Sequence, residues 1–414
     1  MYRHFIFLSI LFLHFMSIAQ PPSRTFPASL LYEKASPQLL QILDNPDTFR
    51  YQLIYTQIDR DRNNNPRFTH YKLRSNKDEY FNPASTVKMP LAFLALEKLH
   101  QMKITGVDKN TPMLTDSAFS RQTTVTEDTS AVNGLPSIAH YIKKIFLISD
   151  NDAYNRLYEF LGQQYINETL WKKGYKDIRI TRRFTPMDEE ENRHTNPIRF
   201  VKDGKTIYTQ PPAYSQAKFN FPQTILIGRA HYNRDEQLVQ SPMDFTRHNN
   251  APLEDLQQIM QSVLFPGSVP AKQRFKLDQD DYKMLYRYMS QMPSESKHPK
   301  YDTSEYFDSY AKFLFKTDRT IPSYIRVFNK TGWSYGFLTD ISYVVDFKNN
   351  IEFMLSALIY VNSDGILNDD KYEYKETGYP FFKEVGNIFY EYELQRKRER
   401  KPDLSKFKIS YTEP

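Results

Sequence analysis

The sequence contains no cysteine among its 414 residues. This absence excludes disulfide bonds, zinc sites built from cysteine, thiolate nucleophiles and lipid attachment through an N-terminal cysteine. The nine histidines show no H-x-x-x-H or H-E-x-x-H spacing, so the sequence favours neither a metal site nor a cofactor. No internal repeat or low-complexity segment is found, which argues against repeat architectures.

Dense runs of one charge are also nearly lacking. The net charge of +6 and the pI of about 9.0 come from lysines and arginines spread along the chain, and the only dense run is Arg396–Lys401. We interpret residues 394–414 as a basic tail with a solvated helix end rather than as a binding patch, and expect no nucleic-acid partner. A hydrophobic content of 40% at this length allows one large core, and we expect a monomer.

Long apolar runs are missing except near the N-terminus. Phe5–Phe15 follows Arg3 and His4, and Ser17-Ile18-Ala19 offers small residues where a signal peptidase cleaves. The run is short for a transmembrane helix. We therefore predict a cleaved secretory signal over residues 1–19, with an uncleaved anchor as the alternative. The mature protein would be periplasmic or secreted, without a stable membrane span.

Hydrophobic periodicity predicts helices and strands in alternating groups after a connector at residues 20–29. The predicted helices cover residues 30–43, 82–100, 138–161, 253–264, 280–289 and 379–393. The predicted strands cover residues 51–59, 68–73, 325–329, 338–346 and 351–361. Two strands early and three late imply an α+β fold: a five-stranded antiparallel sheet flanked by helices, plus a mainly helical subdomain. The N- and C-terminal helices should pack together on one face.

One catalytic domain is expected to span residues 30–393. Its middle, residues 193–250, is polar and rich in Pro, Asn and Gln, and we interpret it as an insertion. A hairpin is predicted there around Lys202-Asp203-Gly204-Lys205.

Three short motifs carry the chemistry: Ser85-Thr86-Val87-Lys88, Ser149-Asp150-Asn151 and Lys330-Thr331-Gly332. The S-x-x-K pattern occurs at four other places, whereas S-D-N and K-T-G each occur once. Taken singly, the motifs are compatible with a helix start, a helix N-cap and a turn before a strand. Their joint occurrence in this order favours a site for nucleophilic acyl transfer.

The residue types suit that chemistry. Ser85 and Lys88 are three residues apart, so they share one helical face, and a lysine with a lowered pKa can deprotonate the serine. Ser149 can relay a proton, and Asn151 can hold a substrate amide or Lys88. Lys330 and Thr331 offer a cation and a hydroxyl to a substrate carboxylate. Backbone amides at Ser85 and Trp333 are candidates for an oxyanion hole.

These motifs resemble those of the penicillin-recognising serine hydrolases, and more closely of their class A β-lactamase-like branch. Asn82–Leu91 resembles the start of the nucleophile helix, Ser149–Leu157 the second motif, and Lys330–Ile341 the third. The resemblance implies that Ser85 is acylated, Lys88 is its base and Ser149 is the proton relay. It also implies that Asn151, Lys330, Thr331, Gly332 and Trp333 bind substrate.

Two departures from the family pattern stand out. Class A enzymes that hydrolyse β-lactams carry a Glu-x-x-Leu-Asn loop whose glutamate activates the deacylating water, and Asp188–Asn192 reproduces only its spacing. Asp188, Glu189, Glu190 and Glu191 are all candidates for this role, or form a solvated turn. Trp333 replaces a small residue, and since it shares a strand face with Thr331, the indole should reach the substrate if Thr331 does.

The sequence thus predicts a serine hydrolase that opens β-lactam amides through a Ser85 acyl-enzyme. One alternative is a D-alanyl peptidase or esterase of the same superfamily with slow β-lactam turnover. Another is a non-catalytic envelope protein that binds peptidoglycan peptides. The expected partner is accordingly a small-molecule or peptidoglycan-peptide substrate.

Overall fold

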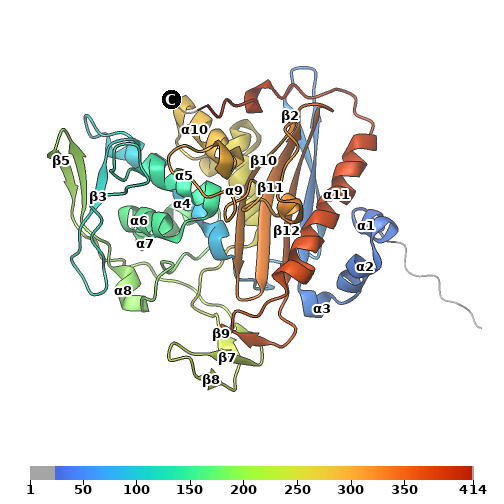
Figure 1. Cartoon of the computed structure of the whole chain (residues 1–414), viewed down its shortest axis with the longest axis horizontal. Helices are drawn as coiled ribbons and strands as arrows, with labels where there is room; N and C mark the ends of the chain where they lie inside the picture. Colours follow the sequence, from blue (N-terminus) through green and yellow to red (C-terminus); the bar gives the residue numbers. More distant parts are fainter. Residues whose placement is uncertain (1–23, 413–414) are drawn as a thin grey trace, which may run out of the picture.

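A five-stranded antiparallel sheet forms the centre of the molecule, which a computed structural model describes over residues 24–412. Its strand order is β10-β11-β12-β1-β2 (Figure 1). The bounds are β1 Gln52–Arg60, β2 Pro66–Leu73, β10 Ile325–Ser334, β11 Phe337–Asp346 and β12 Ile351–Tyr360. The sequence predicted that two early and three late strands form one sheet. The pairing of β1 with β12, in which Gln52 lies opposite Leu358, confirms this.

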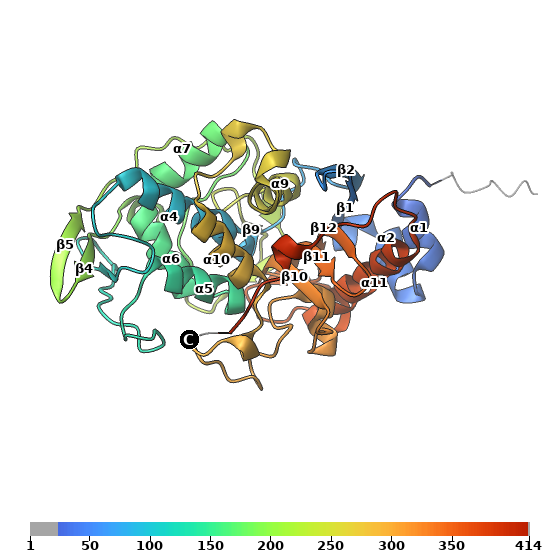
Figure 2. The same cartoon turned by 90° about the horizontal axis from the view of Figure 1, so that it is seen from above.

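Three helices cover one face of the sheet, where Figure 2 shows the C-terminal helix beside the two N-terminal ones. They are α1 (Ala28–Lys34), α2 (Pro37–Asp44) and α11 (Tyr379–Gln395). The predicted packing of N- and C-terminal helices is confirmed: Ser36 Oγ donates to a carboxylate oxygen of Glu384 in α11 over 2.8 Å. The expected single helix over residues 30–43 is wrong. Ala35 is extended, Ser36 caps α2 by accepting from the Leu39 amide, and Pro37 opens that second helix.

The opposite face carries the helical region that holds the first two motifs (Figures 1 and 2). Its helices are α4 Lys88–Met102, α5 Ile138–Ile148, α6 Asn151–Leu161, α7 Gln163–Lys173, α9 Leu253–Leu264 and α10 Gln279–Ser290. The first helix, α4, is apolar and buried nearly all round. It begins only at Lys88, which places Pro90 in the first turn, where proline is tolerated.

The segment expected as an insertion forms two small sheets and a strand pair. The predicted hairpin is present as β4 (Ile198–Lys202) and β5 (Lys205–Gln210), and β4 pairs with β3 (Met113–Thr115). Farther along, β6 (Leu226–Ile227) pairs with β9 (Met243–Asp244). A third group, β7 (Ala230–Tyr232), β8 (Leu238–Val239) and β13 (Ile366–Leu367), forms a lobe beyond one end of the central sheet (Figure 1).

The segment after α11 packs on the protein rather than extending as a solvated basic tail. Arg396 and Arg398 both pair with Glu393, whose side chain is fully buried. Phe407 lies in the core against Phe265. The basic run is therefore partly neutralised by an internal carboxylate.

The predicted signal at residues 1–19 lies outside the described residues. Within residues 24–412, no helix is long and apolar enough to cross a membrane.

Candidate active site

Ser85 lies in the 3₁₀ turn η1 (Ala84–Val87) that leads directly into α4. The turn is held by the Asn82 side chain, which accepts from the Ala84 amide at 2.9 Å, and by Thr86 Oγ1, which donates to the Pro83 carbonyl at 2.6 Å. Ser85 is partly exposed between buried neighbours. Within residues 24–412 its hydroxyl makes no hydrogen bond, so it is free to meet a ligand.

Lys88 is completely buried and bound to the second motif. Its Nζ donates to the Ser149 carbonyl at 2.5 Å and to Asn151 Oδ1 at 2.6 Å, and lies 3.5 Å from Ser149 Oγ. The pKa of Lys88 is lowered well below its ordinary value, first by burial and then by the charge of Lys330. Such a lysine is able to act as a base near neutral pH.

Ser149 is the residue on which the two lysines meet. It ends α5 with a positive φ of 63°, which turns the chain so that Asp150 can cap α6 through the Ala153 amide. Its Oγ accepts from Lys330 Nζ at 2.9 Å. The structure therefore brings together five of the predicted site residues: Ser85, Lys88, Ser149, Asn151 and Lys330.

Lys330 lies on β10, which is an edge strand of the sheet. This strand contacts η1, the serine turn that carries Ser85. It is buried, and its Nζ also donates to the Thr331 carbonyl at 2.6 Å. Burial lowers the pKa of Lys330 to about 7, partly offset by the carboxylate of Asp340. The lysine thus carries a partial positive charge at neutral pH, which suits recognition of a substrate carboxylate.

Gly332 is pressed against the serine turn. A Cβ at this position would lie 2.7 Å from the Pro83 carbonyl oxygen, 2.8 Å from the Ser85 nitrogen and 2.9 Å from the Thr86 nitrogen. Only glycine allows this contact. The resemblance implies that Gly332 binds substrate, and the structure shows that it admits the turn that carries Ser85.

Thr331 and Trp333 share a strand face, as predicted, but that face is turned away from the pocket beside Asn151. The Trp333 ring lies 5.8 Å from Phe313 and 5.9 Å from Tyr310, among residues packed on the α11 side of the sheet. Thr331 is fully buried, and in the described part of the chain its Oγ1 has no hydrogen-bond partner. Neither side chain lines the pocket, so in this structure the indole does not narrow it.

A second cluster of buried polar side chains contacts β10 on the face opposite Lys330. Lys312 Nζ donates to Asn329 Oδ1 at 3.0 Å, and Asn329 Nδ2 donates to Asp340 Oδ1 at 2.9 Å. Burial lowers the pKa of Lys312 to about 7 and raises that of Asp340 to about 6. These groups fix the strand that presents Lys330.

The pocket beside the serine turn and Asn151 has a volume of about 360 Å³. The start of the serine turn and the residues before it, the first residue of α6, and the end of β10 with the turn after it contribute Asn82, Ala84, Asn151, Ser334 and Tyr335. The loop before α8 (Glu189–Arg193) and the insertion contribute Arg182, Phe184, Thr185, Pro186, Arg234, His248 and Asn249, and Asn368 lies beyond β13.

The four acidic residues proposed to activate water bind elsewhere. Asp188 and Glu191 form the capping box of α8, and Glu191 also accepts from Ser120. Glu189 pairs with Arg247, and Glu190 lies beside His194. None of the four lines the pocket or contacts the Ser85 and Lys88 groups.

Phe184 is the residue of this loop that faces Lys88. Its ring centre lies 4.9 Å from Lys88 Nζ, and its amide donates to Asn155 Oδ1 at 2.8 Å. An apolar ring at this position desolvates the lysine and supplies no proton acceptor. Phe184 was not among the predicted site residues, because a carboxylate was expected four residues farther along.

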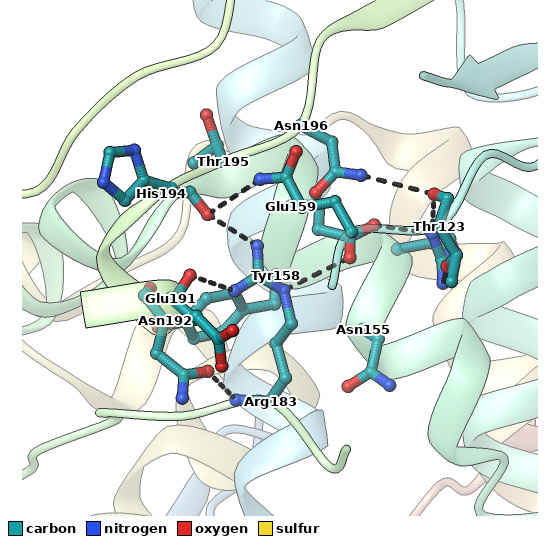
Figure 3. A network of polar contacts seen from close by, with 12 residues as sticks. Thr123, Asn155, Tyr158, Glu159, Arg183, Glu191, Asn192, His194, Thr195 and Asn196 are labelled. Carbon is teal, nitrogen blue, oxygen red and sulfur yellow. Dashed lines mark hydrogen bonds and ion pairs between the residues drawn. The ribbon is translucent and has the colours of Figure 1, made fainter. Parts of the chain in front are cut away.

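Buried Arg183 anchors the loop, as Figure 3 shows. It donates to Glu159 Oε1 at 3.2 Å and to the carbonyls of Glu191 at 3.3 Å and His194 at 2.7 Å, while its amide donates to Asn192 Oδ1 at 2.8 Å. The two ends of the loop are therefore joined through one guanidinium group.

Replacing Arg183 by methionine is expected to cost about 3–5 kcal/mol in the free energy of unfolding, because among the described residues it leaves buried Glu159 with Arg156 as its single ionic partner. Urea unfolding measures the change. Arg62→Met, at an exposed position, is the control and should change stability by less than about 0.5 kcal/mol. A loss below about 1 kcal/mol in Arg183→Met would show that the network does not hold the loop.

Residues 40–218 match the model of the β-lactamase enzyme family. The matched range contains Ser85, Lys88, Ser149 and Asn151, and it ends before β10. This stretch of the chain is therefore similar to the β-lactamase enzyme family. No curated protein matches the sequence of this chain.

Solved β-lactamases are similar to this chain at low sequence identity. The enzyme from Sphaerobacter thermophilus is 13% identical with a TM-score of 0.45, over 84% of this chain and 92% of that one. The enzyme from Desulfarculus baarsii is 14% identical with a TM-score of 0.47, over 87% and 97%. The enzyme from Burkholderia ambifaria is 13% identical with a TM-score of 0.47, over 86% and 99%.

This β-lactamase-like chain also brings His100, Asp278 and Asp281 together at the ends of α4 and α10. Lys109 Nζ already lies 2.9 Å from Asp281 Oδ1 and neutralises part of the acidic charge. The group shares no residue with the Ser85 site.

Proposed function

We propose that this protein forms a covalent acyl-enzyme through Ser85 by opening a β-lactam amide, and that it releases the acyl group slowly. The observation that carries the proposal is Lys88, a fully buried lysine with a lowered pKa, three residues from a free serine hydroxyl. The similarity of residues 40–218 to the β-lactamase enzyme family implies the same nucleophile. The expected rate at which the acyl group is released follows from the residues of the loop before α8.

The hydrogen bonds of Lys88 support its role as base. A neutral amine has two N–H donors and one lone pair. The Ser149 carbonyl and Asn151 Oδ1, at 2.5 and 2.6 Å, take both donors. The lone pair is then left for the Ser85 proton.

The proton path follows from the same contacts. Ser85 Oγ attacks the amide carbonyl carbon while its proton passes to Lys88 Nζ, and the C–N bond then breaks. Ser149 Oγ, placed between Lys88 and Lys330, delivers a proton to the leaving nitrogen and recovers one from Lys88. Lys330 binds the carboxylate of the substrate and favours the neutral form of Lys88.

Slow release follows from what surrounds Lys88. The loop presents a phenylalanine there, and the four nearby acids are engaged in the cap and surface pairs of α8. Water must attack the acyl-enzyme without a dedicated carboxylate. This favours the second candidate function, a D-alanyl peptidase or esterase that turns β-lactams over slowly.

Single replacements Asp188→Asn, Glu189→Gln, Glu190→Gln and Glu191→Gln are expected to leave deacylation within about 2-fold of the unchanged protein, because none of these side chains contacts the site. Release of a fluorescent penicillin from the labelled protein measures the rate. A drop of 10-fold or more in any one variant would mean that the loop supplies the base.

Three outcomes with a chromogenic cephalosporin decide the proposal. A stoichiometric burst followed by slow turnover supports it, and many rapid turnovers would show a true β-lactamase with another source of base. The complete absence of an adduct with any β-lactam would reject both enzymatic functions and favour a peptidoglycan-binding protein.

We also propose that the protein is exported to the periplasm or secreted. The segment that predicts export, residues 1–19, is not among the described residues. A cleaved N-terminus after Ala19 in protein purified from the cell envelope supports export, and an intact Met1 in cytoplasmic protein contradicts it.

A further inference from the structure

The pocket beside Ser85 is rich in hydrogen-bond donors and lacks acids. Its lining residues include two arginines and several asparagines but neither Asp nor Glu. An acid-free pocket with two guanidinium groups is complementary to a negative charge on the ligand.

Neither arginine has an acidic partner within residues 24–412. Arg234 makes no ion pair or side-chain hydrogen bond there. Arg182 contacts His248 Nε2 through Nη1 at 3.0 Å, and burial together with the charge of Arg182 lowers the pKa of His248 to about 3. His248 is therefore neutral, and the charge of Arg182 remains uncompensated.

Arg234 is held at the pocket by a folded turn. Asn233 Oδ1 accepts from the amides of Asp235 and Gln237, both at 2.9 Å, and this fixes the connection between β7 and β8. The lobe is joined to the segment after β12 by pairing of β7 with β13 and by a bond from the Arg229 amide to the Gly365 carbonyl at 2.8 Å. The insertion thus builds one wall of the pocket.

The same pocket contains a side-chain amide, that of Asn151, with an unused hydrogen-bond donor. Asn151 uses its oxygen on Lys88, and Asn249 uses its oxygen on the Thr181 and Arg182 amides. Asn151 Nδ2 has no hydrogen-bond partner within residues 24–412, whereas the Asn249 side chain also bonds to Tyr154. The Asn151 amide can therefore complete a binding site for a charged acyl side chain.

We infer that this pocket is a subsite for a carboxylate on the acyl side chain of the substrate, bound by Arg182 of the loop and Arg234 of the insertion. This inference rests on the proposed acylation of Ser85 and adds the class of substrate. Lys330 binds the carboxylate beside the leaving nitrogen, so the preferred acyl donor is a dianion with one carboxylate on each side of the reacting amide.

Three penicillins that differ at a single carbon test the subsite. Benzylpenicillin has hydrogen there, carbenicillin a carboxylate and ampicillin an amine. We expect the second-order acylation rate to fall in the order carbenicillin, benzylpenicillin, ampicillin, with carbenicillin about 10-fold faster than benzylpenicillin at low salt. Arg182→Met and Arg234→Met should each lower the carbenicillin-to-benzylpenicillin ratio by about 3-fold or more, and the double variant should bring it to about 1. Arg62→Met, which removes a charge from the β1–β2 turn, should leave the ratio unchanged.

The Ser85→Ala variant separates the two proposals by measuring non-covalent binding of the same penicillins. Tighter binding of carbenicillin that is lost in the double arginine variant supports the subsite even if no acyl-enzyme forms. Acylation of the unchanged protein with equal rates for carbenicillin and benzylpenicillin overturns the subsite alone. Equal dissociation constants in Ser85→Ala, or a ratio unaffected by the two arginine replacements, likewise overturn it.

Discussion

Replacing Lys88 by methionine is expected to slow acylation of Ser85 by about three orders of magnitude while the protein stays folded. Methionine fills nearly the same volume in the buried site but cannot accept the serine proton. Stopped-flow measurement of β-lactam opening gives the rate. Lys98→Met is a matched control, because Lys98 lies on the same helix with a pKa lowered by burial to about 8 but does not contact the site. A loss below about 10-fold in Lys88→Met would mean that another group is the base.

The pH dependence of the same reaction separates a base from a merely structural lysine. Because the pKa of Lys88 is lowered, acylation in the unchanged protein should rise with pH and reach its plateau well below the range in which an exposed lysine titrates. Lys330→Gln removes the neighbouring charge that helps to lower this pKa, so the rising limb should move to higher pH. In Lys88→Met the limb should be absent.

Replacing Gly332 by alanine is expected to reduce acylation by at least about 100-fold and to cost about 2–3 kcal/mol in the free energy of unfolding. The new methyl group would lie within 3 Å of three backbone atoms of the serine turn, which cannot rotate away as side chains can. Strand β10 and the turn must separate, and both Ser85 and Lys330 then lose their positions.

Gly267→Ala is the matched control for this substitution. A Cβ at Gly267 meets nothing within 4 Å, so stability and acylation should hardly change. Normal acylation in Gly332→Ala, with the protein folded by circular dichroism, would contradict the close contact between β10 and the serine turn.

Much of the fold could be predicted because its signals are local. Alternation in the five strands and 3.6-residue periodicity in α9 and α11 are visible in the sequence, and the three motifs mark where the site forms. The break between α1 and α2 was also signalled, since Ser36-Pro37 is a typical helix start, but the apolar spacing on both sides concealed it.

The rest depends on contacts that spacing does not encode. Alternation places Thr331 and Trp333 on one face but does not say which face meets the helical region, and the aromatic ring of Phe313 decides this. The acidic run resembles the family loop by spacing alone. The pairing of Arg183 with Glu159, 24 residues earlier, sets the actual position of the loop and brings Phe184 to Lys88. Arg182 and Arg234 line the same pocket only because the insertion folds back over the site.

Intact-mass measurement after exposure to benzylpenicillin, followed by peptide mapping, tests the central claim most directly. The protein should gain the mass of one whole penicillin molecule, persisting for minutes or longer, and the modified peptide should carry it on Ser85. Ser85→Ala should gain no mass. A stable adduct on another residue, or none in a protein that is folded and binds the penicillin, would contradict the assignment of Ser85 as the nucleophile.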